Sequence, residues 1–166
     1  MKGADNVKKY IGTKIIEAQP GTMAEAQALK SNFPIELQKN PGGPQGFIVK
    51  YPDGYISWSP KEVFEAAYRE CDNMPFGLAL EALKKGKKVA RRGWNGKGMF
   101  LFIQDGSRVN TKDLRAELMK EYCKSRAIQH VKINPHIDMK AEDGSHVVGW
   151  LASQADLFAE DWIIVE

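Results

Sequence analysis

Residues 87–103 read KKVARRGWNGKGMFLFI. The runs from Lys87 to Arg92 and from Met99 to Ile103 are short and strand-like, and the segment between them, Gly93 to Gly98, contains three glycines. Two such runs joined by a glycine-containing loop are typical of a β-hairpin. The stretch therefore predicts two paired strands of an antiparallel sheet.

Amphipathic helices are predicted on both sides of this hairpin. Before it, apolar residues recur at three- and four-residue spacing, and Gly86 is placed to end the helix. After it, a helix is predicted from Thr111 to Arg126. The predicted apolar faces are Phe76, Ala79, Leu80 and Leu83 in the first helix, and Leu114, Leu118 and Tyr122 in the second.

The rest of the second half alternates between strands and turns. The predicted elements are a strand at Ile137–Lys140, a turn at Glu142–Gly144, a strand at His146–Trp150, a helical turn at Ser153–Phe158 and a last strand at Trp162–Val165. Together with the hairpin, these elements predict an α+β fold, in which an antiparallel β-sheet carries packed helices.

The first half predicts a smaller α+β module. Its expected strands are Lys14–Glu17, Gly46–Tyr51 and Tyr55–Trp58, the last two joined by a turn at Pro52–Gly54, and its expected helix is Met23–Leu29. A second helix is predicted to start with Ser59 as N-cap, Pro60 at the first helical position and Glu62 closing a capping box. Its expected apolar face is Val63, Phe64, Ala67 and Tyr68.

Two loops are predicted from composition. Asn40–Gly46 is rich in glycine and proline, and Cys71–Asn73 is a short linker. The linker divides the chain into a module at residues 1–72 and a domain at residues 74–166.

Bulk properties narrow the class of protein. The 166 residues contain no apolar run near the roughly 20 residues that cross a membrane, and the first residues lead into no secretory signal. The two cysteines have no metal-ligand or redox spacing. We therefore expect a cytoplasmic protein, without a membrane partner.

The net charge of +3 is unevenly spread. Residues 1–72 contain nine basic and nine acidic side chains, so the excess lies in the second half. Seven of its basic residues fall between Lys84 and Lys97, where no acidic residue occurs. This asymmetry indicates an anionic partner.

The glycine-rich loop is the first candidate binding site. Glycines let the backbone approach a ligand, and Arg91, Arg92 and Lys97 are suited to phosphate. Trp94 offers a flat face on which a base stacks with roughly 1–3 kcal/mol. The alternative is a basic hairpin whose tryptophan covers the core and whose cations are solvated.

A second candidate site follows the strand that ends at Trp150. Ser153 is placed to cap the next helical turn, and a capped turn presents free amide groups to an anion. Here too a purely structural interpretation is open, in which Ser153 caps and Trp150 packs.

The sequence contains no positive sign of catalysis. His130, His136 and His146 lack the spacing of a zinc site on a helix, and nothing indicates that Asp138 and Asp156 converge as an acid–base pair. The glycine-rich loop lacks the Ser or Thr of a Walker motif. We therefore expect no enzyme, no metal and no cofactor.

The same clusters resemble a known family. The blocks Met74–Leu80, Gly86–Leu101, Pro135–Lys140, Trp150–Asp156 and Ala159–Trp162 occur in the order found in the second Thoeris anti-defence family of phages. The resemblance covers about 93 residues from Met74 onward. The first 72 residues lie outside it and resemble a small uncharacterised phage module, to which no activity is assigned.

The resemblance implies a function that the residues alone do not name. Members of the family are non-enzymatic sponges that bind a cyclic ADP-ribose isomer made by the bacterial Thoeris system, and some bind cyclic dinucleotides at a separate site. They are homo-oligomers, typically tetramers, with the ligand between protomers; for this chain a tetramer or a dimer is expected, in the host cytoplasm. Trp94 and Trp150 would flank the adenine, with Arg91, Arg92, Asn95, Lys97 and Ser153 as polar partners.

Two alternatives remain at this point. One is a nucleotide hydrolase, and the other is a nucleic-acid-binding phage accessory protein that uses the basic segment 84–97. In addition, the stretch from Val109 to Ile133 looks longer than the compact connection expected for the family. Three roles are open for it: reshaping the nucleotide pocket, altering assembly, or lying on the surface without a role in binding.

Overall fold

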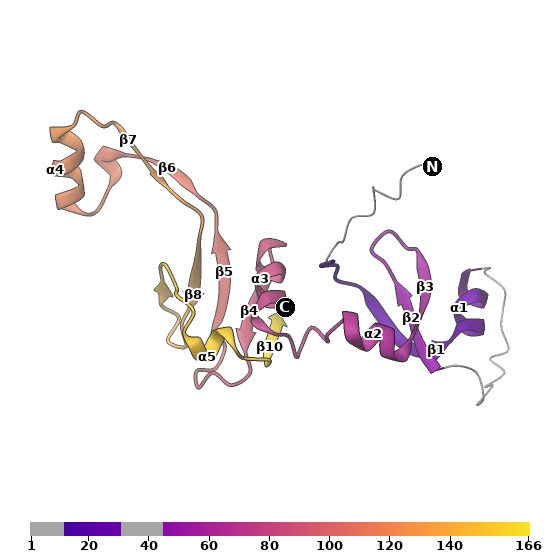
Figure 1. Ribbon diagram of the computed structural model, residues 1–166. Helices are drawn as coiled ribbons and strands as arrows, with labels where there is room; N and C mark the ends of the chain where they lie inside the picture. The colour runs from indigo at the N-terminus through magenta and orange to yellow at the C-terminus, as the bar shows by residue number, and fades with distance from the viewer. Residues whose placement is uncertain (1–11, 31–44) are drawn as a thin grey trace, which may run out of the picture. The chain divides into compact units, whose positions relative to one another are not determined.

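Antiparallel sheets with helices packed on them form both units of the chain, Met1–Arg69 and Glu70–Glu166 (Figure 1). The computed structural model describes residues 12–30 and 45–166. The predicted α+β class is confirmed. The predicted loop at Asn40–Gly46 falls mostly outside the described residues. In the parts described, no helix is long and apolar enough to cross a membrane.

The first unit contains a three-stranded sheet in the order β1-β2-β3. Its elements are β1 (Glu17–Thr22), α1 (Met23–Lys30), β2 (Gln45–Lys50), β3 (Ile56–Pro60) and α2 (Lys61–Ala67). The predicted hairpin between β2 and β3 is confirmed, because the turn at Pro52–Gly54 joins them and Gly54 has a positive φ of 85°. The predicted helix at Met23–Leu29 is confirmed as α1.

Two local predictions in this unit are wrong. The first strand starts at Glu17, not Lys14, because Glu17 pairs with Lys50, where β2 ends before the hairpin turn, and residues 14–16 have no strand beside them. Ser59 does not cap α2, because Ser59 and Pro60 still pair with Phe47 and Gly46 in the sheet.

The apolar face expected for α2 is only partly formed. Phe64 stacks on Phe47, with ring centroids 4.1 Å apart, and on Tyr68, with centroids 4.8 Å apart. Val63 is 60% exposed and Ala67 is exposed as well. The helix is seven residues long and packs mainly through two aromatic rings.

The second unit is built on a five-stranded sheet in the order β10-β4-β5-β8-β9. Its strands are β4 (Lys88–Arg91), β5 (Phe100–Gln104), β8 (His136–Lys140), β9 (His146–Val147) and β10 (Trp162–Val165), and its packed helices are α3 (Phe76–Lys84) and α5 (Gln154–Leu157). The predicted hairpin is confirmed and corresponds to β4 and β5. The helix predicted before it is confirmed as α3, and the predicted last strand is confirmed as β10.

One face of this sheet carries the hydrophobic core. Val89, Leu101 and Trp162 are fully buried there against Leu83 of α3. Side chains alternate between the two faces along a strand, so Lys88, Phe100 and Phe102 lie on the opposite face. Those rings are only partly buried, and this second face is called the open face below.

The strand predicted at His146–Trp150 is shorter than expected. Pairing with β8 ends at Val147, because Gly149 adopts a positive φ of 78° and turns the chain. The Trp150 amide then donates to the Ile137 carbonyl at 2.7 Å, which returns the chain to the sheet.

The helix predicted from Thr111 to Arg126 is corrected to two helical segments between two strands. The segment contains β6 (Ser107–Asn110), the 3-10 turn η1 (Thr111–Asp113), α4 (Glu117–Ser125) and β7 (His130–Ile133). The helix is interrupted because Leu114 adopts an extended conformation, with ψ 144°. Leu118 and Tyr122, expected on the apolar face of that helix, are 82% and 49% exposed.

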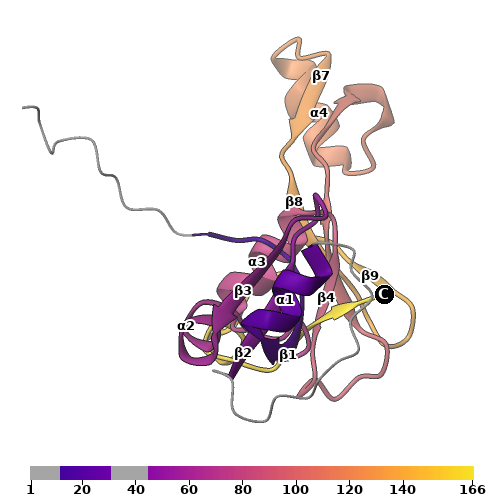
Figure 2. The same ribbon diagram turned by 90° about the vertical axis from the view of Figure 1, so that its right-hand side faces the viewer.

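These elements form an arm, defined here as residues 105–135. β6 and β7 pair with one another and with no strand of the five-stranded sheet. Two perpendicular views show the paired strands extending away from that sheet, with α4 at the far end (Figures 1 and 2).

Gly46 lies where β2 and β3 approach each other closely, so we expect a side chain added there to destabilise this strand pair. A Cβ placed there would lie 2.6 Å from two ring carbons of Trp58 and would also meet the Ser59 carbonyl. We expect Gly46→Ala to lower the opening free energy of the β2 and β3 amides by about 1–3 kcal/mol in hydrogen exchange. Gly12→Ala is the control, since nothing lies within 4 Å of its Cβ; unchanged exchange in Gly46→Ala would contradict the packing.

Candidate functional site

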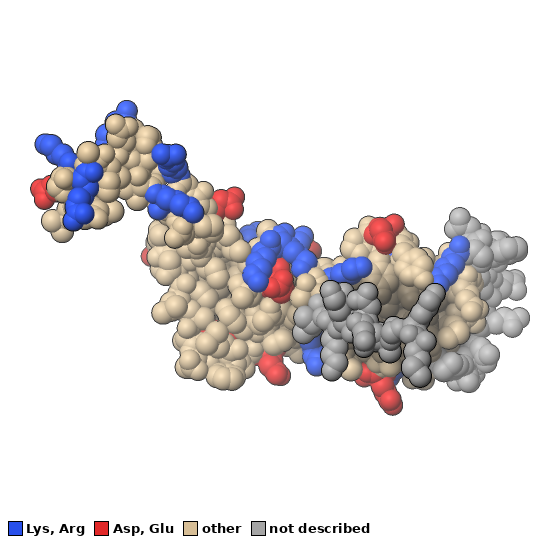
Figure 3. Space-filling model, turned by 45° about the horizontal axis from the view of Figure 1, so that its top comes forward, with Lys and Arg blue, Asp and Glu red and all other residues tan. Residues whose placement is uncertain are grey.

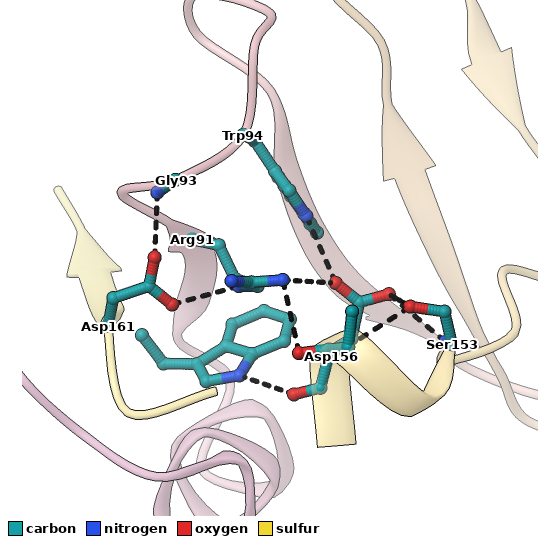
Figure 4. A network of polar contacts seen from close by, with 8 residues as sticks. Arg91, Gly93, Trp94, Ser153, Asp156 and Asp161 are labelled. Atoms are coloured by element: carbon teal, nitrogen blue, oxygen red, sulfur yellow. Dashed lines mark hydrogen bonds and ion pairs between the residues drawn. The ribbon is translucent and has the colours of Figure 1, made fainter. Parts of the chain in front are cut away.

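Asp156 joins three segments that are far apart in the sequence. Its carboxylate accepts hydrogen bonds from Arg91 Nη1 at 3.0 Å, Trp94 Nε1 at 3.2 Å and Ser153 Oγ at 2.6 Å. Its backbone carbonyl accepts one from Trp162 Nε1 at 3.0 Å. Figure 4 shows these donors converging on the carboxylate from β4, the glycine-rich loop and the start of α5.

Asp161 completes this network on the far side of Arg91. It accepts from Arg91 Nε at 2.8 Å and from the Gly93 amide at 2.7 Å (Figure 4). Arg91 therefore lies between two carboxylates, and its side chain is only 19% exposed. This geometry holds the start of the glycine-rich loop against the end of the chain.

The charges of the network stabilise one another. The Asp161 carboxylate raises the pKa of Arg91, and in turn Arg91, followed by the Gly93 amide, lowers the pKa of Asp161. Burial alone would raise the pKa of Asp156, but hydrogen bonds from Ser153, Arg91 and Trp94 outweigh it and leave that pKa below its ordinary value. Both aspartates are thus ionised acceptors at neutral pH.

Trp94 and Trp150 lie beside Trp162 at one edge of the core. Their centroids are 6.3 Å apart with ring planes inclined by 63°, and each meets the buried Trp162 ring edge-to-face. Both rings are partly buried and pack against the hydrophobic core, which is the structural role that the sequence left open for them. Because the two planes are strongly inclined, one flat base cannot stack on both rings of a single chain at once.

The predicted polar partners fall into three groups. Arg91 and Ser153 are engaged within the network: Ser153 caps α5 in a reciprocal capping box with Asp156, at the helical turn the sequence predicted. Arg92 is half-exposed and pairs with Asp72 at 3.6 Å. Asn95 and Lys97 are exposed on the loop, and their side chains form no hydrogen bond or ion pair with any described residue.

Several cations of the basic run between Lys84 and Lys97 are engaged within the fold. Lys84 pairs with Glu81, Arg91 with its two aspartates and Arg92 with Asp72. Lys88 lies on the open face, with its ammonium 5.3 Å from the Phe100 ring centroid. Four of the seven cations are therefore engaged by other groups of the fold.

The open face of the sheet has a shallow cleft of about 470 Å³. Its lining combines aromatic and cationic groups: Lys88, Phe100, Phe102, Lys140, Gly144, Ser145 and His146. No candidate site was predicted on this face from the sequence. The available signal was the strand alternation that places Lys88, Phe100 and Phe102 on the same face.

A second carboxylate, Asp138, is buried beside the cleft. It is 1% exposed and accepts from the Gly149 amide at 2.8 Å, while His146 Nε2 lies 2.8 Å and His136 Nε2 3.4 Å from its oxygens. Asp138 and Asp156 thus belong to separate networks. Within residues 12–30 and 45–166, no group of three or more His, Cys, Asp or Glu is arranged to hold a metal ion.

Comparison with known proteins places the second unit among phage proteins. Residues 74–165 match the family described as the Thoeris anti-defense 2-like domain. A relative named Thoeris anti-defense 2, from Bacillus phage SP01, is 39% identical over 92 residues, which cover 55% of this chain and 94% of the relative. The resemblance predicted from the sequence blocks is confirmed, and the matched range includes the arm.

The network around Asp156 predicts a pH-dependent stability. Because the folded pKa values of Asp156 and Asp161 are lowered, their contribution is complete above the ordinary value of 3.8 and is lost as the pH falls below it. We expect Asp156→Asn to lower the free energy of unfolding by about 1–3 kcal/mol at neutral pH, measured in guanidinium by tryptophan fluorescence.

The difference in the free energy of unfolding between Asp156→Asn and wild type should shrink as the pH falls below 3.8. The control is Glu142→Gln, because Glu142 is exposed and lies outside the network. This variant should leave the midpoint of guanidinium unfolding unchanged. A difference that is the same at every pH would rule out the ionised network.

Proposed function

The chain belongs, through residues 74–165, to the Thoeris anti-defense 2-like family of phage proteins, and on this premise we propose that it binds and sequesters a cyclic ADP-ribose-type signal without cleaving it. Family membership is the observation that carries the proposal. Capture of the signal would keep the effector of the bacterial Thoeris system silent.

The proposed site is the glycine-rich loop with the adjacent tryptophans. The Asp156 network holds the loop in place, so Trp94 is ordered before a ligand binds and little entropy is lost on binding. Asn95 and Lys97 are unengaged and available to polar groups and phosphate. Arg91 and Ser153 act by positioning the loop.

The inclined tryptophans support a site that is shared between protomers. One adenine stacks on only one of these rings in a given chain, and in the proposed site a second flat surface comes from another copy. We therefore propose a homo-oligomer, a dimer or a tetramer. Sequestration calls for nanomolar affinity, about −12 kcal/mol, which stacking and charge-assisted hydrogen bonds supply together.

Capture without turnover also fits the chemistry of the described residues. The two buried aspartates are occupied as hydrogen-bond acceptors in separate networks. A hydrolase built on either of these two carboxylates would need that group free to move a proton at the ligand. Their engagement supports the proposal of a binding protein, which family membership carries.

The cleft on the open face suits a second ligand class. Cyclic dinucleotides carry two bases and two phosphates, and the cleft offers two phenyl rings with Lys88 and Lys140. Its volume lies in the range of small-molecule sites, about 300–1,000 Å³. We propose this cleft as the separate site for cyclic dinucleotides.

Signal capture predicts intact ligand after denaturation. The protein is incubated with the cyclic ADP-ribose isomer, freed of unbound ligand, denatured and analysed by mass spectrometry. We expect near-stoichiometric intact ligand, and a loss of affinity of about tenfold or more in Lys97→Ala, because a charge-assisted contact is removed. Light scattering of the loaded protein gives the number of chains.

Lys87→Ala is the matched control, since Lys87 is exposed and without an ion pair among the described residues. Recovery of ligand fragments would establish a hydrolase instead. If the protein retains no cyclic nucleotide, both the capture proposal and the hydrolase alternative are wrong.

The two proposed sites predict separable variants. Lys88→Ala should weaken binding of a cyclic dinucleotide by about tenfold, because an ammonium group leaves the cleft, and should leave capture of the cyclic ADP-ribose isomer unchanged. Isothermal titration calorimetry with both ligands and with Lys97→Ala in parallel tests this. Equal losses for both ligands in one variant would show a single site.

A further inference from the structure

The arm contains the positive charge excess of the whole chain. Residues 105–135 include seven lysines and arginines and four acidic residues, a difference of +3, which equals the net charge of the 166-residue chain. The rest of the molecule is therefore balanced. Figure 3 shows lysine and arginine side chains outnumbering acidic ones on the arm, at the left of the view.

Two of these cations face each other across the arm. In the pairing of β6 with β7, Arg108 lies directly opposite Lys132, so both side chains project from the same face. Like charges directly opposite one another destabilise a strand pair. Such a pair lowers the stability of an arm that has few other contacts, unless an anion lies over both side chains.

The described residues supply no such anion. Of the seven cations, Lys120 pairs with Glu117 at 2.7 Å and Arg126 lies over the Tyr122 ring. The other five are without an ion pair to any described residue: Arg108, Lys112, Arg115, Lys124 and Lys132. They are exposed, and they occur on β6, η1, β7, α4 and the segment before α4. The arm therefore presents cations along its length.

We propose that the arm binds the phosphate backbone of double-stranded DNA, independently of nucleotide capture. A two-stranded antiparallel ribbon has the width that the major groove of B-DNA admits. In that position, Arg108 and Lys132 meet phosphates of the duplex, and the cations of η1 and α4 meet phosphates farther along the backbone. The contacts are to phosphates, so the binding is not specific for sequence.

A duplex fits better than an acidic protein surface. Phosphates follow one another at regular, short spacing along both strands, which matches unpaired cations distributed along the arm and not gathered in one pocket. This surface is also different from the basic segment 84–97, whose arginines are paired within the fold.

The test is fluorescence anisotropy of the full chain with a labelled duplex of mixed sequence, from about 50 to 200 mM salt. We expect micromolar binding at low salt that weakens steeply as salt rises. Arg108→Gln with Lys132→Gln should weaken binding at least tenfold at low salt and reduce the slope of log K against log salt by about two. Because it removes a like-charge pair, this double variant should unfold no earlier than wild type.

Lys85→Gln with Lys87→Gln removes the same charge from exposed positions outside the arm and should leave binding nearly unchanged. Equal weakening by the two double variants, or no binding of the duplex at low salt, would overturn the proposal. So would competition by polyglutamate as effective as competition by unlabelled DNA, because the arm would then be a surface for acidic proteins.

Discussion

The ionised carboxylate of Asp156, buried at the edge of the core, is the constraint on which the second unit depends. A buried charge is tolerated only when its hydrogen-bonding capacity is filled, and here Arg91, Trp94 and Ser153 fill it. These donors belong to a strand, a glycine-rich loop and a helix cap. A single side chain therefore ties the loop and the start of α5 to the sheet, and Asp161 adds the link to the end of the chain.

The same constraint separates the residues that hold the glycine-rich loop from the residues that the network leaves unengaged. Arginine beside glycine and tryptophan is the composition of a phosphate site, yet Arg91 is occupied by Asp156 and Asp161. What the loop leaves exposed is Asn95 and Lys97. The internal ion network therefore leaves these two polar side chains of the loop unengaged by any described residue.

Three surfaces of the second unit differ in what they present. The loop offers an indole and two free polar groups, the open face offers a cleft with two phenyl rings and two lysines, and the arm offers unpaired cations. We propose that each binds an anion of a different size, from one cyclic nucleotide to a polymer. The mild net charge of the chain conceals this division, because its excess lies on a single projecting element.

Local patterns in the sequence were enough to predict the α+β class, the β4–β5 hairpin, the helix ending near Gly86, the helical turn that Ser153 caps and the family. Each depends on residues that are close together along the chain. The tertiary structure alone decided which side chains are free, because Arg91 meets Asp161 across 70 positions and Asp156 across 65. It also decided that the helix predicted at Thr111–Arg126 is broken and carried on an arm, since the apolar spacing of Leu118 and Tyr122 indicates a helical face but not whether anything packs on it.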